Sequence, residues 1–135
     1  MTAPLFQPLT IRHVTFRNRF MSTSHACGLE EGGMPKERYQ RYHEEKAKGG
    51  IGLTMFGGSS NVAPDSPSVF QQLYVGDDEV FPYLQQFSEC VHKHGAAIMC
   101  QITHLGRRGE PYQGHWLPTI GPSAIRKTLH RSFLK

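Results

Sequence analysis

Hydrophobic and polar residues follow two different periods along this chain, and the period changes several times. Residues 9–11 and 14–16 alternate by twos, which predicts a short hairpin. Residues 20–24, 51–56 and 96–103 are runs with few charged side chains, as in strands that are covered on both faces of a sheet. These segments predict strands.

Two other segments carry the three- and four-residue spacing of amphipathic helices. The first covers residues 36–48 and is ended by Gly49-Gly50. The second follows the acidic residues 77–79, which suit the positive end of a helix, and Gly95 predicts its left-handed stop. The positions expected to be buried are Tyr39, Tyr42, His43 and Ala47 in the first helix, and Val80, Leu84, Phe87 and Val91 in the second.

Strand and helix signals therefore alternate, which favours a parallel α/β fold over a helix bundle or a sandwich. Residues 57–67 are rich in glycine, serine, asparagine and proline and are predicted to be a loop. We expect Asn18-Arg19 to anchor the entrance of the first strand of the sheet. No composition shift or internal repeat indicates a second domain.

Composition and charge exclude several classes of protein. Cys27, Cys90 and Cys100 form no CxxC pair, and with no secretory leader in view they argue against a disulfide framework and for the cytoplasm. No apolar run approaches the roughly 20 residues that span a membrane. The formal charge of +4 is not gathered into a basic stripe, so we expect no nucleic-acid partner. His92 and His94 lack further ligands for a metal, and the dipole at a helix end accounts for them.

Three tracts carry a resemblance to a known family. They are residues 18–31 (NRFMSTSHACGLEE), 49–53 (GGIGL) and 101–107 (QITHLGR). In this order and spacing the chain resembles the old yellow enzyme family of flavin oxidoreductases. Gly28-Leu29-Glu30-Glu31 and Gly57-Gly58 look most similar to the branch that contains 2,4-dienoyl-CoA reductase, trimethylamine dehydrogenase and related amine demethylases.

The resemblance implies a fold. Members of the family are (β/α)8 TIM barrels, so residues 1–135 are expected to form the amino-terminal portion of such a barrel. This portion holds about three of the eight strands, as a partial FMN-binding barrel without a second domain. The active site of a TIM barrel lies at the carboxyl ends of its strands. The candidate residues lie at those ends.

The resemblance also implies a site for noncovalent FMN, with NAD(P)H as a possible reductant. Ser24, His25, Ala26 and Cys27 match the family's stretch along the edge of the flavin. Gly58 matches the position where bare backbone lies against the ring, because a β-carbon would occupy ring space. Gln101 is the sharpest candidate, since a primary amide presents a donor and an acceptor in one plane to the pyrimidine edge. Taken alone, a glutamine on a strand is usually a satisfied core or rim residue, and it is the matching order of Asn18-Arg19, Gly58 and Gln101 that favours the flavin site.

Positions 26 and 27 bear on whether the flavin is held covalently. In the amine dehydrogenases of the family a cysteine in this stretch bonds covalently to the flavin, but here that position is Ala26. Cys27 comes one residue later, which should aim its thiol away from the ring because neighbouring side chains on an extended segment point to opposite sides. A small buried hydrophobe is the alternative role for Cys27. His104 is expected to pack against neighbouring strands, and Arg107 is expected to order the loop by bonding backbone carbonyls.

No residue is assigned as catalytic. In the family, the substrate anchors, the proton donor, the phosphate cradle and the iron-sulfur cluster would all lie past the equivalent of Lys135, in a full-length parent. Two functions remain open. One is an FMN-dependent oxidoreductase, a reductase or an amine demethylase, that passes hydride through flavin N5 and takes a small-molecule substrate, present here as an incomplete chain that is inactive alone. The other is a noncatalytic partial-barrel module that needs a partner chain or self-associates through its exposed edge.

Overall fold

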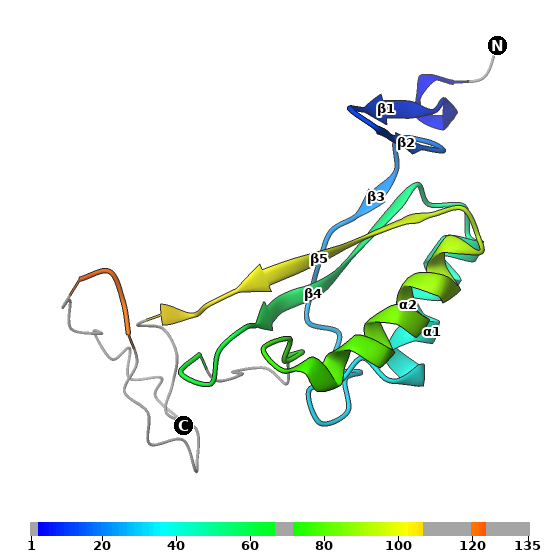
Figure 1. Ribbon diagram of the computed structural model, residues 1–135. Helices are drawn as coiled ribbons and strands as arrows, with labels where there is room; N and C mark the ends of the chain where they lie inside the picture. The colour runs from blue at the N-terminus through cyan, green and yellow to red at the C-terminus, as the bar shows by residue number, and fades with distance from the viewer. Residues whose placement is uncertain (1–2, 67–71, 107–119, 124–135) are drawn as a thin grey trace, which may run out of the picture.

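The computed structural model describes residues 3–66, 72–106 and 120–123. Figure 1 traces the chain from the amino-terminal hairpin through two strand-helix units to the last strand. The elements in chain order are η1 (Pro4–Phe6), β1 (Leu9–Ile11), β2 (Val14–Phe16), β3 (Met21–Ser22), α1 (Glu37–Lys48), β4 (Leu53–Asn61), η2 (Asp78–Val80), α2 (Phe81–His92) and β5 (Ala97–Thr103).

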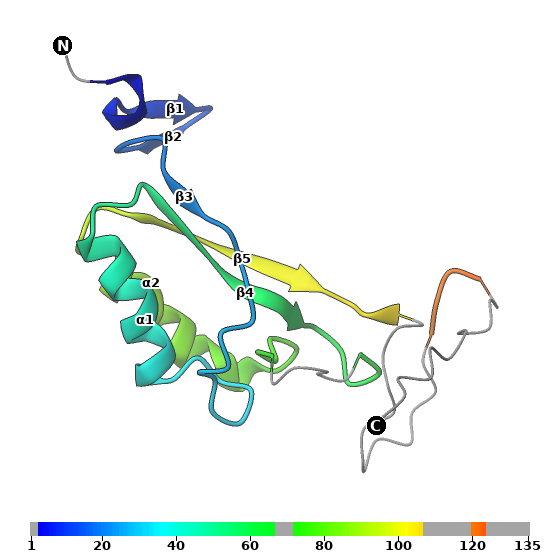
Figure 2. The ribbon, with the colours of Figure 1, turned by 180° about the vertical axis from the view of Figure 1, so that it is seen from behind.

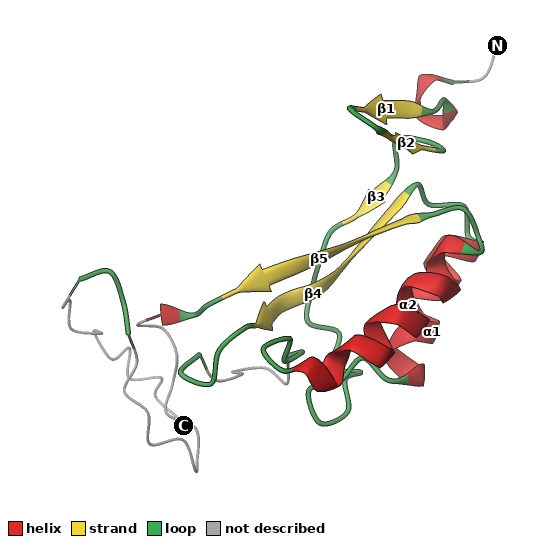
Figure 3. Cartoon of the chain, in the orientation of Figure 1, coloured by secondary structure: helices red, strands yellow, loops and turns green. Residues whose placement is uncertain are grey.

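The strands form two separate sheets. β1 and β2 pair antiparallel, with Leu9 opposite Phe16, and so confirm the hairpin. β3, β4 and β5 form a three-stranded sheet in that order, and both of its pairings are parallel. Helices α1 and α2 lie side by side along one face of this sheet (Figures 2 and 3). The predicted parallel α/β arrangement is therefore confirmed.

The core lies between the helices and the sheet. Phe87 of α2 is fully buried, and its ring centroid lies 4.8 Å from that of Phe56 on β4. Val80 and Val91 are buried as predicted, while Leu84 is only partly buried. The alternation of side chains along the strands explains the pattern, because every second strand residue points toward the helices.

The opposite face of the sheet is open. Ile98 and Cys100 of β5 pack into the core, whereas Met99 between them is 45% exposed. Met21 of β3 is 50% exposed. Met99 pairs with Met55 in the ladder, so apolar side chains continue across this face.

β4 is longer than predicted. The loop prediction for residues 57–67 is wrong for its first five residues, since β4 continues to Asn61. Gly57 and Gly58 have φ values of +108° and +52°, and the register with β5 shifts between Phe56 and Ser60 before pairing resumes at Ser60 and Ile102. The two glycines thus form an irregularity within the strand. β3 is shorter than its predicted run, because only Met21 and Ser22 pair with β4.

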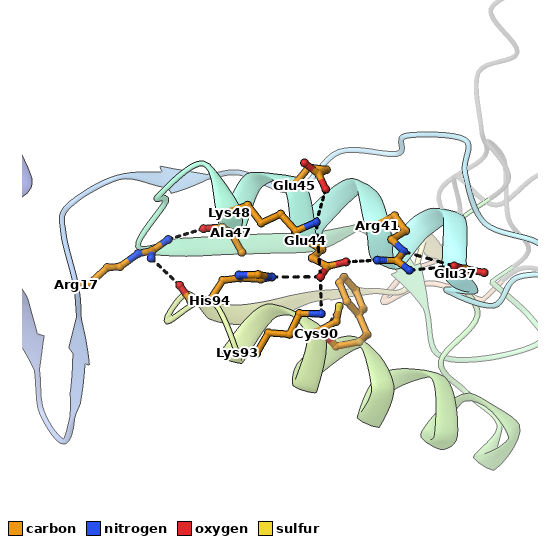
Figure 4. Close-up of polar contacts among 11 residues, drawn as sticks. Arg17, Glu37, Arg41, Glu44, Glu45, Ala47, Lys48, Cys90, Lys93 and His94 are labelled. Carbon is orange, nitrogen blue, oxygen red and sulfur yellow. Dashed lines mark hydrogen bonds and ion pairs between the residues drawn. The ribbon is translucent and has the colours of Figure 1, made fainter.

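The amino ends of the strands are tied to the helices. Asn18 Nδ2 donates to the Gly50 carbonyl at 2.7 Å, as expected for an anchor. The neighbouring Arg17 does more. Its guanidinium donates to the Ile51 carbonyl at 3.0 Å. It also donates to the carbonyls of Ala47 and His94, each at 2.6 Å (Figure 4).

A buried carboxylate joins the two helices. The Glu44 side chain on α1 is 3% exposed and pairs with Lys93 at 2.6 Å, Arg41 at 3.1 Å and His94 at 3.2 Å (Figure 4). Hydrogen bonds from Lys93 and His94 lower the pKa of Glu44 to about 2. The dipole explanation for His94 is therefore incomplete, since its ring bonds to a specific acid on the other helix.

A second polar group is buried in the same layer. His43 is 2% exposed, and its Nδ1 lies 2.7 Å from Thr54 Oγ1, which in turn lies 3.1 Å from Ser22 Oγ. Burial among aromatic rings lowers the pKa of His43 to about 3, so the imidazole is neutral. Across the described ranges, no helix is both long and apolar enough to cross a membrane, and no cluster of three acid, histidine or cysteine side chains could hold a metal ion.

Candidate functional site

The predicted site residues come together at the carboxyl ends of β3, β4 and β5. Ser24 follows β3, and Gln101 lies near the end of β5. The Ser24 hydroxyl donates to Gln101 Oε1 at 2.7 Å, so a side-chain bond links the segments of the two outer strands. The middle strand carries Gly57 and Gly58 at this level. The Gln101 residue is exposed, and its amide is held by the bond from Ser24.

The two glycines allow this close approach. A β-carbon on Gly58 would overlap the backbone of His25 and Ala26. A β-carbon on Gly57 would lie 2.6 Å from the Gln101 carbonyl oxygen. The strand end is thus squeezed between both neighbours, and this packing by itself demands glycine. The predicted reason for glycine at position 58 was contact with a flavin, which stays a prediction.

The side chain of His25 turns toward the helix layer. Its Nε2 lies 2.9 Å from the Tyr42 hydroxyl of α1, and the two rings meet edge to face with centroids 5.7 Å apart. His25 therefore presents its backbone, rather than its imidazole, to the strand ends. Ala26 is exposed beside it.

Cys27 also points toward the helices. Its side chain packs against the buried cluster that contains Tyr39, Phe56 and Phe87. Burial raises the pKa of the thiol, which keeps it protonated and weakly nucleophilic. This geometry matches the role of a small buried hydrophobe, with the thiol directed away from the open face of the sheet.

The loops that follow β4 and β5 are latched to each other. His104 Nε2 lies 3.2 Å from Asp65 Oδ1, and the Gly106 N–H donates to His104 Nδ1 at 3.0 Å. The Leu105 N–H donates to Ser66 Oγ at 2.7 Å. Both nitrogens of His104 are thus engaged in holding a loop, whereas the sequence predicted that it packs against neighbouring strands. Arg107 lies outside the described residues.

Sequence reasoning missed three buried polar residues beneath these loops. Asn61, Ser66 and Gln72 are 1%, 1% and 5% exposed. They fall in a stretch whose composition is typical of a solvated loop, and no periodicity separates a buried amide from an exposed one there. Their burial accompanies the extension of β4, at whose end Asn61 bridges to Tyr74 and lies beside the buried residues 72 and 73.

The comparisons with known proteins identify the family. The model of the NADH:flavin oxidoreductase / NADH oxidase family matches residues 4–132. The chain belongs to this family. It is 61% identical over 129 residues to a multifunctional alkene reductase/demethylase of Caballeronia cordobensis, which covers 96% of this chain and 19% of that protein. It is 47% identical over 132 residues to a probable N-methylproline demethylase of Rhizobium meliloti (strain 1021), which covers 98% of this chain and 20% of that protein.

Solved structures of the family share the fold. Morphinone reductase superposes with a TM-score of 0.81 at 23% identity, over 90% of this chain and 32% of that one. The old yellow enzyme from Trypanosoma cruzi superposes with a TM-score of 0.69 at 26% identity, over 80% of this chain and 29% of that one. The chain is thus a portion of the old yellow enzyme barrel, as the sequence predicted. It spans about a fifth of the length of the two curated relatives.

Proposed function

We propose that this chain supplies one wall of an FMN site in a flavin-dependent oxidoreductase. The observation that carries the proposal is the bond from Ser24 to Gln101 across the strand that carries Gly57 and Gly58. It brings a planar amide, bare backbone and an exposed extended segment to one end of the sheet. In a barrel this end is where cofactors and substrates bind.

Each part of the wall has a role toward the flavin. The Gln101 amide presents a donor and an acceptor to the pyrimidine edge, and the Ser24 hydroxyl fixes which way the amide is turned. Gly58 and the backbone of residues 25–26 line the ring, while Cys27 packs below them. When bound noncovalently, FMN supplies the hydride acceptor at N5, with NAD(P)H as a reductant.

The relatives narrow the substrate class. Two of the relatives are an alkene reductase/demethylase and a probable N-methylproline demethylase, and a third, 47% identical over 133 residues, is an N,N-dimethylglycine/sarcosine dehydrogenase of Chromohalobacter salexigens. We infer a small substrate that is either an N-methylated amine or an activated alkene. An N-methylated amine gives a hydride to a flavin, and an activated alkene takes a hydride from one. In both cases the flavin atom is N5.

The site formed by this chain alone is incomplete. Residues 1–135 act as one partial-barrel domain, and the catalytic acid, the phosphate cradle and any iron-sulfur cluster belong to a longer parent. Charge-assisted hydrogen bonds to a phosphate contribute about 1.5 to 3 kcal/mol each, so without them FMN binds orders of magnitude more weakly. We therefore propose that the isolated chain is colourless and has no turnover.

A titration of FMN into the chain tests the proposal. Gln101→Leu should weaken binding by about tenfold, because one polar edge of the flavin loses its partner. Gln85→Leu is the matched control, since Gln85 is an exposed glutamine on α2 that bonds to Glu89. Flavin fluorescence gives the affinity, and a nicotinamide oxidation assay gives turnover.

Three results would contradict the proposal in different ways. Equal FMN affinity of Gln101→Leu and Gln85→Leu would show that Gln101 is not part of the site. Stoichiometric FMN retained through gel filtration would show that residues 1–135 suffice to hold the cofactor. Turnover above that of free flavin would place catalytic groups within this chain.

The open face of the sheet favours a second candidate, a noncatalytic module that binds another chain. Met21 and Met99 are about half exposed on this face, and β3 and β5 are the outer strands of the sheet. Unpaired strand edges of this kind template association. Light scattering should report oligomers that Met99→Glu reduces, whereas Phe81→Glu, which changes a 60% exposed side chain on α2, should not. A monodisperse wild-type monomer would contradict this candidate.

A further inference from the structure

A chain of hydrogen bonds runs beneath the loops at the carboxyl ends of β4 and β5. The Leu105 N–H donates to Ser66 Oγ at 2.7 Å, and the Ser66 hydroxyl donates to Asn61 Oδ1 at 3.2 Å. Asn61 Nδ2 donates to Gln72 Oε1, and Gln72 Nε2 donates to the Gly58 carbonyl, each at 3.4 Å. Every link donates in the same direction, so the dipoles along the chain reinforce one another.

Asn61 is the centre of this arrangement. Its backbone N–H donates to the Leu73 carbonyl, and its carbonyl accepts from Val75, both at 2.8 Å. Its side chain bonds to Ser66 and Gln72. One residue at the end of β4 therefore fixes the segment that carries Gln72. That segment also contacts the loop after β3, where Tyr74 N–H donates to the Gly33 carbonyl at 2.9 Å.

This chain of hydrogen bonds ends at Gly58, the residue where backbone orientation matters most. Gly58 has a φ of +52° and sits against the backbone of residues 25–26. Glycine in this conformation has a wide choice of backbone angles, so an outside bond is needed to select one. The buried Gln72 side chain donates its amide N–H to the Gly58 carbonyl, and this bond restricts the orientation of the peptide that follows Gly58.

We propose that Asn61 and Gln72 are positioning residues for the flavin wall, which act by fixing the Gly58-Ser59 peptide. This inference rests on the proposed function. Neither side chain touches the cofactor. Ser66 extends their effect to the loop after β5, so that the loops following β4 and β5 and the flavin wall are set together.

A single NMR cross-peak reports on the Gly58-Ser59 peptide. Gly58-Ser59 is the only Gly-Ser pair in the sequence. Labelling glycine with carbonyl ¹³C and serine with ¹⁵N therefore gives one cross-peak that joins the Gly58 carbonyl to the Ser59 amide. Gln72→Met keeps the length of the side chain and removes its amide, while Gln86→Met makes the same change at an exposed position on α2.

We expect Gln72→Met to move this cross-peak in the absence of FMN and to weaken FMN binding by about fivefold. Gln86→Met should do neither. Ser66→Ala changes a residue farther from Gly58 along the hydrogen bonds, so it should move the peak in the same direction by a smaller amount. This variant tests the same proposal if Gln72→Met does not fold.

The outcomes separate the two proposals. A cross-peak unchanged in both Gln72→Met and Ser66→Ala would overturn the positioning role. A moved cross-peak with unchanged FMN affinity would also overturn it, because the peptide would then be set without effect on the cofactor. Failure of FMN to bind the wild-type chain at millimolar concentration would instead overturn the proposed function, and with it any role of these residues toward flavin.

Discussion

The helix layer and the carboxyl ends of the strands are built in different ways. In the helix layer, Phe87 and Val91 are fully buried, and Glu44 is held by Arg41 of α1 and by Lys93, which follows α2. Arg17 ties the amino ends of the strands to this layer through three hydrogen bonds of 2.6 to 3.0 Å. At the carboxyl ends, the adjacent Gly57 and Gly58 have positive φ. The hydrogen bonds from Asn61 to Gln72 and from Gln72 to Gly58 are each 3.4 Å long.

The difference separates stability from binding. Short bonds to charged groups and a close-packed aromatic core hold the strands in register, and they need no ligand. The carboxyl ends keep their backbone exposed and adjustable, as a surface must if it is to receive a cofactor. This division follows the general rule for barrels, in which the amino-terminal face serves stability and the carboxyl-terminal face serves function.

The largest effect is expected from the core of the helix layer. Phe87→Ala should lower the free energy of unfolding by about 3 to 5 kcal/mol, because it leaves a cavity at a fully buried site. Phe81→Ala changes the same residue type on the same helix at a 60% exposed position and should cost less than about 0.5 kcal/mol. Urea denaturation measures both. Equal losses would mean that the helices do not pack on the sheet as described.

The second-largest loss of stability is expected from a change at Arg17. Arg17→Met removes all three of its bonds to backbone carbonyls, so we expect a loss of about 3 kcal/mol in the free energy of unfolding. Arg38→Met, at an exposed position on α1, is the control and should be nearly neutral. If Arg17→Met is as stable as the control, the amino ends of the strands are not held by this residue.

Acid should weaken the helix layer through His43. The folded chain holds the pKa of His43 at about 3 against an ordinary value of 6.5, so between these values the unfolded chain binds a proton that the folded chain refuses. The free energy of unfolding should therefore fall as the pH is lowered, by about 1.6 kcal/mol between pH 6.5 and 5. His43→Gln should flatten this slope. Glu44 acts in a lower window, since its pKa is lowered from 4.5 to about 2. An equal slope in His43→Gln and wild type would contradict this assignment.

A smaller effect is expected from Gly58 when it is compared with a matched glycine. Gly28 and Gly58 both have positive φ, so alanine strains the backbone at either position. Only at Gly58 does the added β-carbon meet other backbone, whereas nothing lies within 4 Å at Gly28. Gly58→Ala should therefore cost about 1.5 kcal/mol more than Gly28→Ala. Thermal unfolding of the pair measures the difference, and its absence would argue against the squeezed strand end.

The sequence predicted the hairpin, both helices, the three parallel strands and the meeting of Ser24, Gly58 and Gln101. Periodic burial and the order of the motifs carry that information. It did not predict the extension of β4, because paired glycines followed by serine and asparagine look like a loop. It also missed Arg17, Glu44 and Gln72, since their partners lie far away in the chain and only the packed fold brings them close.

The most direct test of the flavin wall is the Gly58-Ser59 cross-peak of the wild-type chain during titration with FMN. We expect the peak to move progressively and to saturate in the millimolar range, and AMP, which carries a phosphate without the isoalloxazine ring, should leave it in place. A cross-peak that does not respond to FMN, or that moves equally with AMP, would contradict the placement of the flavin against this strand end.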